Sequence, residues 1–322
     1  MNTMKFELFK NARKPLELNA KPGQEVLIVS DTNTEREVYE AFASAAYDMG
    51  LEPNVMVMAA RKMHGHEPTK TVAGAMKGTD LLIAAASTAL THTDAVRAAL
   101  KAGVTYISMP GISVDMLTNG GAAADYKEVG EITHRIAEML RKSTSQVRVT
   151  TQNGTDMTMS VTGRPIMELA GVYRQGAIAC FPDGEVACAP LEGTCQGKLV
   201  IDMHMHSIGH IKEFIVLTIE KGNVVKIDGG AQAEQLREIW ATNGDRNSAN
   251  IAELALGTNP RSRLTGHVSE IKKKLGLVHI GIGDNRSLGG NVYSATHMDA
   301  VINNPTVIVD NTIVFDNGKL AF

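Results

Sequence analysis

In the first half of the chain, short apolar runs alternate with segments in which apolar residues recur every three or four positions. The runs predict strands and the segments between them predict amphipathic helices. The expected strands span residues 25–31, 54–60, 80–87 and 104–111, and the expected helices span residues 34–50, 91–103 and 126–143. Because strands that alternate with helices usually form a parallel sheet covered by helices, we expect a Rossmann-like α/β domain over residues 1–145.

In the second half, the pattern changes to short β-prone runs with fewer helical segments. Residues 146–163 contain two such runs around Asn153-Gly154, a dipeptide typical of hairpin turns. Further strands are expected at residues 177–182, 198–206, 214–230, 306–311 and 312–320, and helices near residues 231–241 and 263–275. We therefore expect an α+β domain with a mainly antiparallel sheet over residues 146–322, which would carry the catalytic metal site.

Composition and charge exclude several classes of function. The net charge of -3 and the low aromatic content of 4% argue against a nucleic-acid partner. No apolar run approaches the roughly 20 residues that a membrane span needs, and the N-terminus does not resemble a signal peptide. We expect a cytoplasmic protein without a membrane partner. The three cysteines lack a CxxC pair, which indicates reduced thiols and not a disulfide framework or a zinc knuckle.

Near the C-terminus, ionisable residues stand in an apolar, glycine-rich stretch. His279 lies in KLGLVHIGIG, and His297-Met298-Asp299 follows a glycine-rich loop. On a strand, residues two apart project to the same face, so His297 and Asp299 could bind one divalent cation, or two neighbouring ones if the carboxylate bridges them. The alternative for His279 is a buried imidazole that hydrogen-bonds to the backbone.

Two glutamates further upstream stand in similarly apolar surroundings. Glu253 lies in ANIAELALGTNP, and Glu185 lies in FPDGEVACAP. A buried carboxylate is unfavourable unless it is paired or bound to a metal. The alternatives are the solvent face of an amphipathic helix for Glu253 and a surface hairpin for Glu185. Oxygen and nitrogen ligands of this kind suit Zn²⁺, Mn²⁺, Co²⁺ or Fe²⁺.

Four segments in this order, GEVACAPLEGTCQGKLVID, IAELALGTNP, LGLVHIGIG and ATHMD, resemble the M29 metallo-aminopeptidase family, the aminopeptidase T type. The resemblance implies a two-metal centre that activates water to cleave an amide or peptide bond. It implies metal ligands at Glu185, Glu253, His279, His297 and Asp299. It also implies that Glu185 or Glu253 carries the proton to the leaving nitrogen.

The loop between His279 and His297 departs from the aminopeptidase pattern. Those enzymes place a tyrosine soon after the histidine that His279 matches, whereas Asp284, Asn285 and Arg286 stand there in this chain. A phenol at that place would polarise a carbonyl or stabilise an oxyanion. We expect Arg286 instead to act on an acidic substrate as part of the catalytic machinery.

The same loop, SLGGNVYSATHMD, resembles more closely that of 2,5-dihydroxypyridine 5,6-dioxygenase, which implies ring cleavage at mononuclear Fe(II). That group has a histidine where this chain has Glu253. The ligand set favours a metal-dependent hydrolase, which we expect first, and the loop favours the dioxygenase acting on a hydroxylated pyridine-like aromatic as the alternative. The resemblances imply one or two divalent metal ions per chain, a small-molecule or short-peptide substrate and a homo-oligomer.

Overall fold

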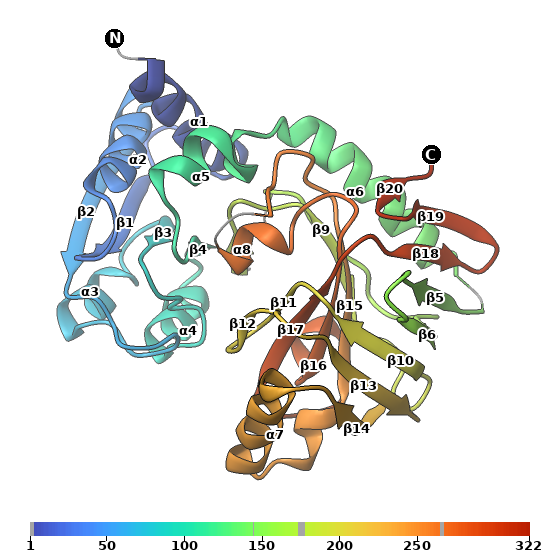
Figure 1. Cartoon of the computed structure of the whole chain (residues 1–322). Helices are drawn as coiled ribbons and strands as arrows, with labels where there is room; N and C mark the ends of the chain where they lie inside the picture. The colour runs from blue at the N-terminus through green and yellow to red at the C-terminus, as the bar shows by residue number, and fades with distance from the viewer. Residues whose placement is uncertain (1–2, 144, 173–177, 265–266) are drawn as a thin grey trace. The chain divides into compact units, whose positions relative to one another are not determined.

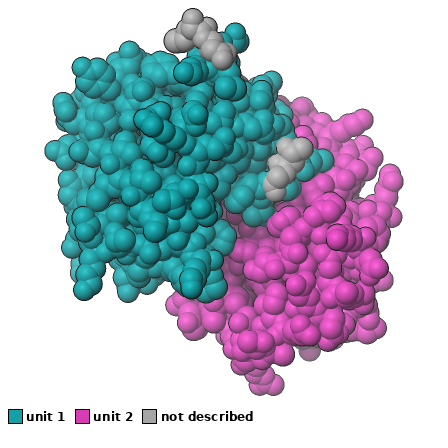
Figure 2. Space-filling view, turned by 60° about the vertical axis from the view of Figure 1, so that its left-hand side comes forward, with its two compact units in different colours: residues 1–128, 169–183, 260–271 teal, residues 129–168, 184–259, 272–322 magenta. Residues whose placement is uncertain are grey.

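The computed structural model of the protein describes residues 3–143, 145–172, 178–264 and 267–322. The chain divides into two compact units, each built from three segments (Figure 2). Unit 1 comprises residues 1–128, 169–183 and 260–271, and unit 2 comprises residues 129–168, 184–259 and 272–322.

Unit 1 is built around a five-stranded parallel sheet with the strand order β2-β1-β3-β4-β8 (Figure 1). Its strands are β1 (Glu25–Asp31), β2 (Glu52–Met58), β3 (Leu81–Ala85), β4 (Thr105–Ser108) and β8 (Ile178–Cys180). Its helices include α1 (Thr3–Asn19), α2 (Arg36–Asp48), α3 (Lys70–Ala75), α4 (Asp94–Lys101), α5 (Val114–Asn119) and the short α8 (Val268–Ile271). Every residue of β3 is buried, as expected for a strand inside a sheet that helices cover. The expected α/β architecture with a parallel sheet is confirmed.

Strand β8 is the fifth strand of this parallel sheet. Sequence analysis placed residues 177–182 in the mainly antiparallel domain, and this assignment was wrong. β8 pairs in parallel with β4, with Tyr106 opposite Ile178 and Ser108 opposite Cys180. Its short apolar run could not identify a partner strand about 70 residues earlier in the sequence, because both kinds of sheet accept such a run.

Unit 2 contains two antiparallel sheets, which confirms the expected fold class of the second half. The eight-stranded sheet has the order β14-β13-β10-β6-β5-β18-β19-β20, and the seven-stranded sheet has the order β12-β11-β17-β16-β15-β9-β7. The strands of the larger sheet are β5 (Val147–Thr150), β6 (Asp156–Met159), β10 (Gln196–Ile201), β13 (Ile215–Glu220), β14 (Asn223–Asp228), β18 (Thr306–Val309), β19 (Thr312–Asp316) and β20 (Lys319–Leu320). Those of the smaller sheet are β7 (Met167–Leu169), β9 (Glu185–Cys188), β11 (His204–Met205), β12 (Gly209–His210), β15 (Ile251–Gly257), β16 (Val278–Gly283) and β17 (His297–Ile302).

One hydrophobic core joins the two sheets of unit 2. It contains Leu217 from the larger sheet and Ile280 from the smaller one. Helix α6 (Tyr126–Arg141) contributes Ile136 and Leu140 to the same core. Residue 145, where sequence analysis placed the domain boundary, therefore lies within the first segment of unit 2.

The two helices expected in the second half differ in outcome. The helix near residues 231–241 is confirmed as α7 (Ala231–Asn243), which ends at Gly244 in the left-handed conformation. The helix expected over residues 263–275 was wrong in extent, since among the described residues of that range only the four residues of α8 are helical. Residues 265 and 266 lie outside the described part of the chain. Within the described residues, we find no helix that is both long and apolar enough to cross a membrane.

Candidate metal centre

All five predicted ligands lie on one face of the smaller antiparallel sheet. In β9, β16, β17 and the part of β15 from Glu253 onward, the even-numbered residues, such as Leu254, Ile280 and Ala300, belong to the hydrophobic core. Because successive side chains on a strand point to opposite faces, the odd-numbered residues point away from that core. The odd-numbered positions include Glu185, Glu253, His279, His297 and Asp299. The alternation explains why ionisable residues stand in otherwise apolar strands.

The strand register aligns two of these ligands, Glu253 and Asp299, on either side of a glycine. Glu253 of β15 lies opposite Gly281 of β16, and Gly281 lies opposite Asp299 of β17. A Cβ atom at Gly281 would come within 2.6 Å of Glu253 Cβ and 2.8 Å of His297 Nε2. A glycine is therefore needed at the middle position, because any side chain there would occupy the space into which the ligands from both neighbouring strands project.

Glu253, His297 and Asp299 form the compact part of the cluster. His297 Nε2 lies 2.8 Å from Glu253 Oε2 and 3.2 Å from Asp299 Oδ1. One ligand atom from each of the three residues lies within 4.8 Å of the others. Glu253 and Asp299 are buried, whereas the His297 side chain is 32% exposed, so solutes can approach the group from the His297 side. These residues form a candidate site for a divalent metal ion.

His279 and Glu185 extend this group along the sheet. His279 is fully buried, and its Nε2 lies 3.6 Å from Glu253 Oε1 and 3.8 Å from Glu185 Oε2. Among the described residues, neither His279 Nε2 nor Glu185 Oε2 has a hydrogen-bond partner. Buried polar atoms are nearly always paired, and an imidazole nitrogen and a carboxylate oxygen left unpaired next to the compact group are donor types that suit a divalent cation. The donor set is thus compatible with a bound divalent metal.

Two lysines that sequence analysis did not select also belong to this cluster. Lys273 Nζ lies 2.5 Å from Glu185 Oε1, and Lys272 Nζ lies 3.0 Å from Asp299 Oδ2. The Lys273 side chain is only 1% exposed. Three consecutive lysines at the end of an expected amphipathic helix indicate a solvated surface, and only the actual course of the chain after α8 brings two of them to the carboxylates.

The electrostatics of the compact group follow from its burial and its pairs. Burial by itself raises the pKa of Glu253, but His279 and His297 lower it well below its ordinary value. Burial likewise raises the pKa of Asp299, but Lys272 and His297 lower it well below its usual range. Burial lowers the pKa of His297, but Asp299 and Glu253 raise it well above the ordinary value of an imidazole. In the metal-free protein, these opposite charges stabilise one another.

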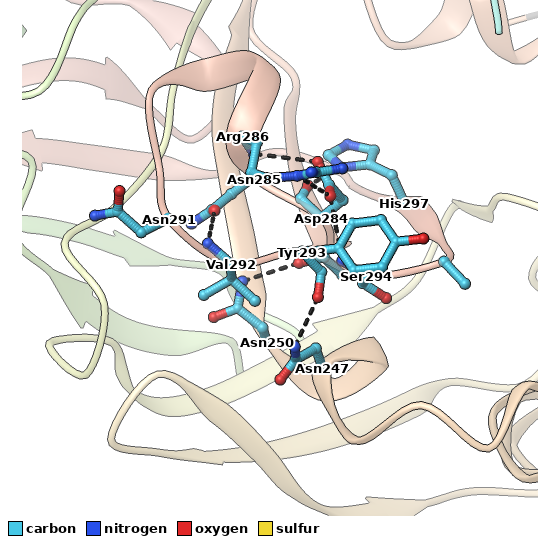
Figure 3. A network of polar contacts seen from close by, with 12 residues as sticks. Asn247, Asn250, Asp284, Asn285, Arg286, Asn291, Val292, Tyr293, Ser294 and His297 are labelled. Atoms are coloured by element: carbon cyan, nitrogen blue, oxygen red, sulfur yellow. Dashed lines mark hydrogen bonds and ion pairs between the residues drawn. The ribbon is translucent and has the colours of Figure 1, made fainter.

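The orientation of His297 is set by the loop that precedes it (Figure 3). Its Nδ1 lies 2.7 Å from the backbone carbonyl oxygen of Asp284. A carbonyl oxygen can only accept a hydrogen bond, so Nδ1 carries a proton and Nε2 is directed at the carboxylates. The Asp284 carboxylate in turn accepts hydrogen bonds from the backbone amides of Arg286 and Ser294, at 3.1 and 3.2 Å.

Asn285 and Glu192 hold the same loop in place through hydrogen bonds. The Asn285 side chain is buried, accepts a hydrogen bond from the Val292 amide at 2.8 Å, and donates one to Glu192 Oε1 at 3.0 Å. Arg164 forms an ion pair with the second oxygen of Glu192. Burial raises the pKa of Glu192, but hydrogen bonds from Asn291 and Asn285 and the charge of Arg164 lower it to about 2.

Arg286, which was predicted to be catalytic, lies in this loop and outside the carboxylate cluster. Its side chain is 56% exposed, and its Nε donates to the Asp284 carboxylate at 2.9 Å. The guanidinium stacks over the ring of Tyr293, 4.3 Å from the ring centroid. Figure 3 shows both side chains on the loop that leads to His297. The structure thus places Arg286 two residues from the carbonyl group that orients His297.

The fold and the candidate site are those of a class of metal-binding enzymes that have a parallel-sheet unit and an antiparallel unit with the metal site. A family model described as 2,5-dihydroxypyridine 5,6-dioxygenase (NicX) matches residues 7–322, and the chain belongs to this family. The chain is 25% identical over 198 residues to 2,5-dihydroxypyridine 5,6-dioxygenase of Pseudomonas putida KT2440, an alignment covering 58% of this chain and 57% of that protein.

Two solved structures share this fold over almost their whole length. The structure of the 2,5-dihydroxypyridine dioxygenase from Pseudomonas putida KT2440 superposes with a TM-score of 0.81 at 19% identity, covering 98% of this chain and 97% of that one. Wild-type AmpT from Thermus thermophilus superposes with a TM-score of 0.70 at 17% identity, covering 99% and 100%. The similarity to both groups that the sequence motifs indicated is confirmed at the level of the fold.

Proposed function

We propose that this chain is a metal-dependent dioxygenase that opens the ring of a hydroxylated, pyridine-like aromatic compound. The observation that carries the proposal is the compact Glu253, His297 and Asp299 group in a chain whose family match extends over residues 7–322. Family membership favours this activity over amide hydrolysis, which the ligand types had led us to expect first.

The residues of unit 2 would share the work as follows. Glu253, His297 and Asp299 would hold one divalent ion, and ferrous iron bound there would supply the redox chemistry for the reaction of the ring with dioxygen. The Asp284 carbonyl keeps the His297 ring in its binding orientation. Arg286, exposed beside this loop, would bind an anionic oxygen of the substrate and orient the ring.

Glu253 is the main difference from the dioxygenase pattern, which has a histidine at the matching position. Non-haem iron oxygenases commonly use two histidines and one carboxylate. In this chain His279 is the nearest second imidazole, with its Nε2 3.6 Å from Glu253 Oε1. We therefore expect the Glu253→His variant to retain or increase iron-dependent ring opening, whereas Asp299→Asn should lose it together with the metal.

The test uses the purified chain loaded with Fe²⁺ without oxygen and then mixed with 2,5-dihydroxypyridine in aerated buffer. The expected result is oxygen uptake in equal proportion to the loss of the aromatic absorbance, since both oxygen atoms enter the product. Asp299→Asn serves as the metal-free control. Absence of oxygen uptake by the iron-loaded chain with this compound and with related hydroxylated pyridines would contradict the proposal.

Amide hydrolysis is the second candidate, and one observation favours it. Glu185 and His279 continue the compact group along the sheet beyond Glu253, which provides the larger set of ligands that a two-metal hydrolase uses. Its test is the release of amine from aminoacyl anilides by the chain loaded with Mn²⁺ or Zn²⁺. Amine release without oxygen uptake would replace the first proposal by this one.

A further inference from the structure

We propose that Lys273 takes the place of a second metal ion, so that this centre binds a single divalent ion. This role of Lys273 presupposes the metal ion proposed above at Glu253, His297 and Asp299. It concerns the part of the cluster around Glu185, which the sequence motifs predict to be a metal ligand.

The contact between Lys273 and Glu185 is the central observation. Lys273 Nζ lies 2.5 Å from Glu185 Oε1, and both side chains are almost completely buried, with 1% and 5% exposed. The Coulomb attraction between two charges this close and this well shielded from solvent is much stronger than in a surface pair, because little water screens it. Neither charge can lose its partner without leaving the other buried and uncompensated. Glu185 Oε2 faces His279, but at 3.8 Å it is further from that imidazole than Glu253 is from either of its histidines.

The backbone around Lys273 is held firmly against the sheet. The Asn259 amide donates to the Lys273 carbonyl, and the Leu275 amide donates to the Asn259 carbonyl, both at 2.9 Å. The Lys274 carbonyl oxygen lies so close to Gly257 that a Cβ atom there would meet it at 2.2 Å. The segment that carries the ammonium is therefore fixed next to Glu185, and the lysine cannot be moved aside by a small shift of its backbone.

A second metal ion at Glu185 would lie beside this ammonium group. Two cations at such short range in a buried site repel each other strongly. Two-metal hydrolases need ions about 3.5–4 Å apart that share ligands, and this requires carboxylates that are free to bind both. In this chain one oxygen of Glu185 is already engaged by Lys273, so the lysine supplies the positive charge that a second ion would supply.

Lys272 differs from Lys273, although it also contacts a carboxylate of the cluster. Its side chain is 23% exposed, and its partner Asp299 belongs to the compact group with His297 and Glu253. Asp299 Oδ1 remains directed at His297 Nε2, 3.2 Å away. Asp299 therefore keeps an oxygen within the compact group, whereas Glu185 lies outside it.

The experiment counts bound ions and does not depend on turnover. The metal-free full-length chain is titrated with Mn²⁺, and the bound metal is measured by elemental analysis and by electron paramagnetic resonance. We expect the wild-type chain to bind one ion tightly, with the spectrum of an isolated Mn²⁺. We expect Glu185→Gln to bind the same single ion, because Glu185 is not needed for it.

Replacing the lysine should open the second position. Lys273→Met frees Glu185, so this variant should bind a second Mn²⁺ and show the spectrum of an exchange-coupled pair. The double variant Lys273→Met with Glu185→Gln should return to one ion. Lys274→Met is the matched control, because it removes an ammonium group from the same lysine run, whereas the ion pairs with Asp299 and Glu185 come from Lys272 and Lys273. This variant should bind one ion.

The possible results separate the two proposals. Two tightly bound, coupled ions in the wild-type chain would overturn the role of Lys273 and leave the metal site itself intact. Loss of the single ion in Glu185→Gln would also overturn it, as would a folded Lys273→Met variant that still binds only one ion. No bound ion in the wild-type chain would overturn the metal site and the role of Lys273 together. The wild-type and Glu185→Gln measurements can each overturn the role of Lys273 even where Lys273→Met does not fold.

Discussion

Gly281 lies directly against His297, so that a Cβ atom at position 281 would stand 2.8 Å from the Nε2 atom of the imidazole. The same Cβ atom would stand 2.6 Å from Glu253 Cβ, which belongs to the opposite neighbouring strand. Both contacts are far shorter than ordinary van der Waals distances. At Gly281, strand β16 therefore contributes space to the compact group, and the neighbouring strands β15 and β17 contribute its ligand atoms.

Replacing Gly281 by alanine should accordingly abolish metal binding while the fold survives. The added methyl group displaces Glu253 and His297 from each other, and overpacking of this kind costs about 1–3 kcal/mol of unfolding free energy. Isothermal titration with Mn²⁺ and urea denaturation measure the two effects. Gly130→Ala is the control, because a Cβ atom there meets no atom within 4 Å. Metal affinity equal to wild type in Gly281→Ala would show that the site lies elsewhere.

Asn285 should matter for metal affinity although it is not a candidate ligand. Its side chain holds the loop that delivers the Asp284 carbonyl to His297, through the Val292 amide and Glu192. Loss of a supporting contact behind a metal ligand typically weakens binding about 10–100-fold, and we expect this for Asn285→Ala. Asn291→Ala is the matched control, since only the backbone amide of that exposed residue contacts Glu192. Equal losses of Mn²⁺ affinity in both variants would contradict the specific role of Asn285.

Metal affinity should rise with pH through the neutral range. The pKa of His297 in the metal-free protein is raised well above its ordinary value by Asp299 and Glu253, which outweigh the opposing effect of burial. A metal ion binds the neutral imidazole, so binding must release the proton from Nε2. Calorimetric titration in two buffers with different ionisation enthalpies should therefore report proton release near neutral pH. His297→Gln should remove that released proton.

The stability of the metal-free protein should fall as the pH rises above the neutral range, whereas metal affinity should rise. The pKa of His297 is raised, so its contribution is fully present below the unfolded value of about 6.5 and is lost as the pH rises through the folded value. The pKa values of Glu253 and Asp299 are lowered, so their contributions are present above about pH 4 and are lost as the pH falls through the folded values. Urea denaturation across this range should show a maximum between about pH 4 and pH 6.5, the window between these unfolded values. A flat profile would contradict the charge assignment.

Arg286 should act on substrate binding more than on metal binding. Its guanidinium is exposed, pairs with Asp284 and stacks over Tyr293, outside the carboxylate cluster. Arg286→Gln should raise KM for an anionic aromatic substrate about tenfold and leave Mn²⁺ affinity near the wild-type value, because it removes a charge-assisted hydrogen bond to the substrate. The exposed Arg246, replaced in the same way, should leave KM unchanged. A change in kcat alone would assign Arg286 to the chemical step.

Much of this molecule follows from local patterns. Apolar runs separated by helical segments are enough to predict the parallel sheet of unit 1, since both features depend on residues close together in the chain. The residue types of all five candidate ligands were readable in the sequence motifs, as was the pairing of His297 and Asp299 on one face of a strand. Strand β15 was not among the expected strands, and the sequence left open a helix for Glu253.

Contacts between segments that are distant in the sequence became known only from the tertiary structure. No local pattern indicates that β8 pairs with β4, or that Lys273 reaches Glu185 from a segment expected to be helical. Glycine at position 281 was visible in the sequence, but its necessity depends on the register of three strands. The alternation of residues along a strand indicates on which face of the sheet a side chain lies. The residues that it contacts depend on which strands pair, and hydrogen bonding and core packing between remote segments determine that pairing.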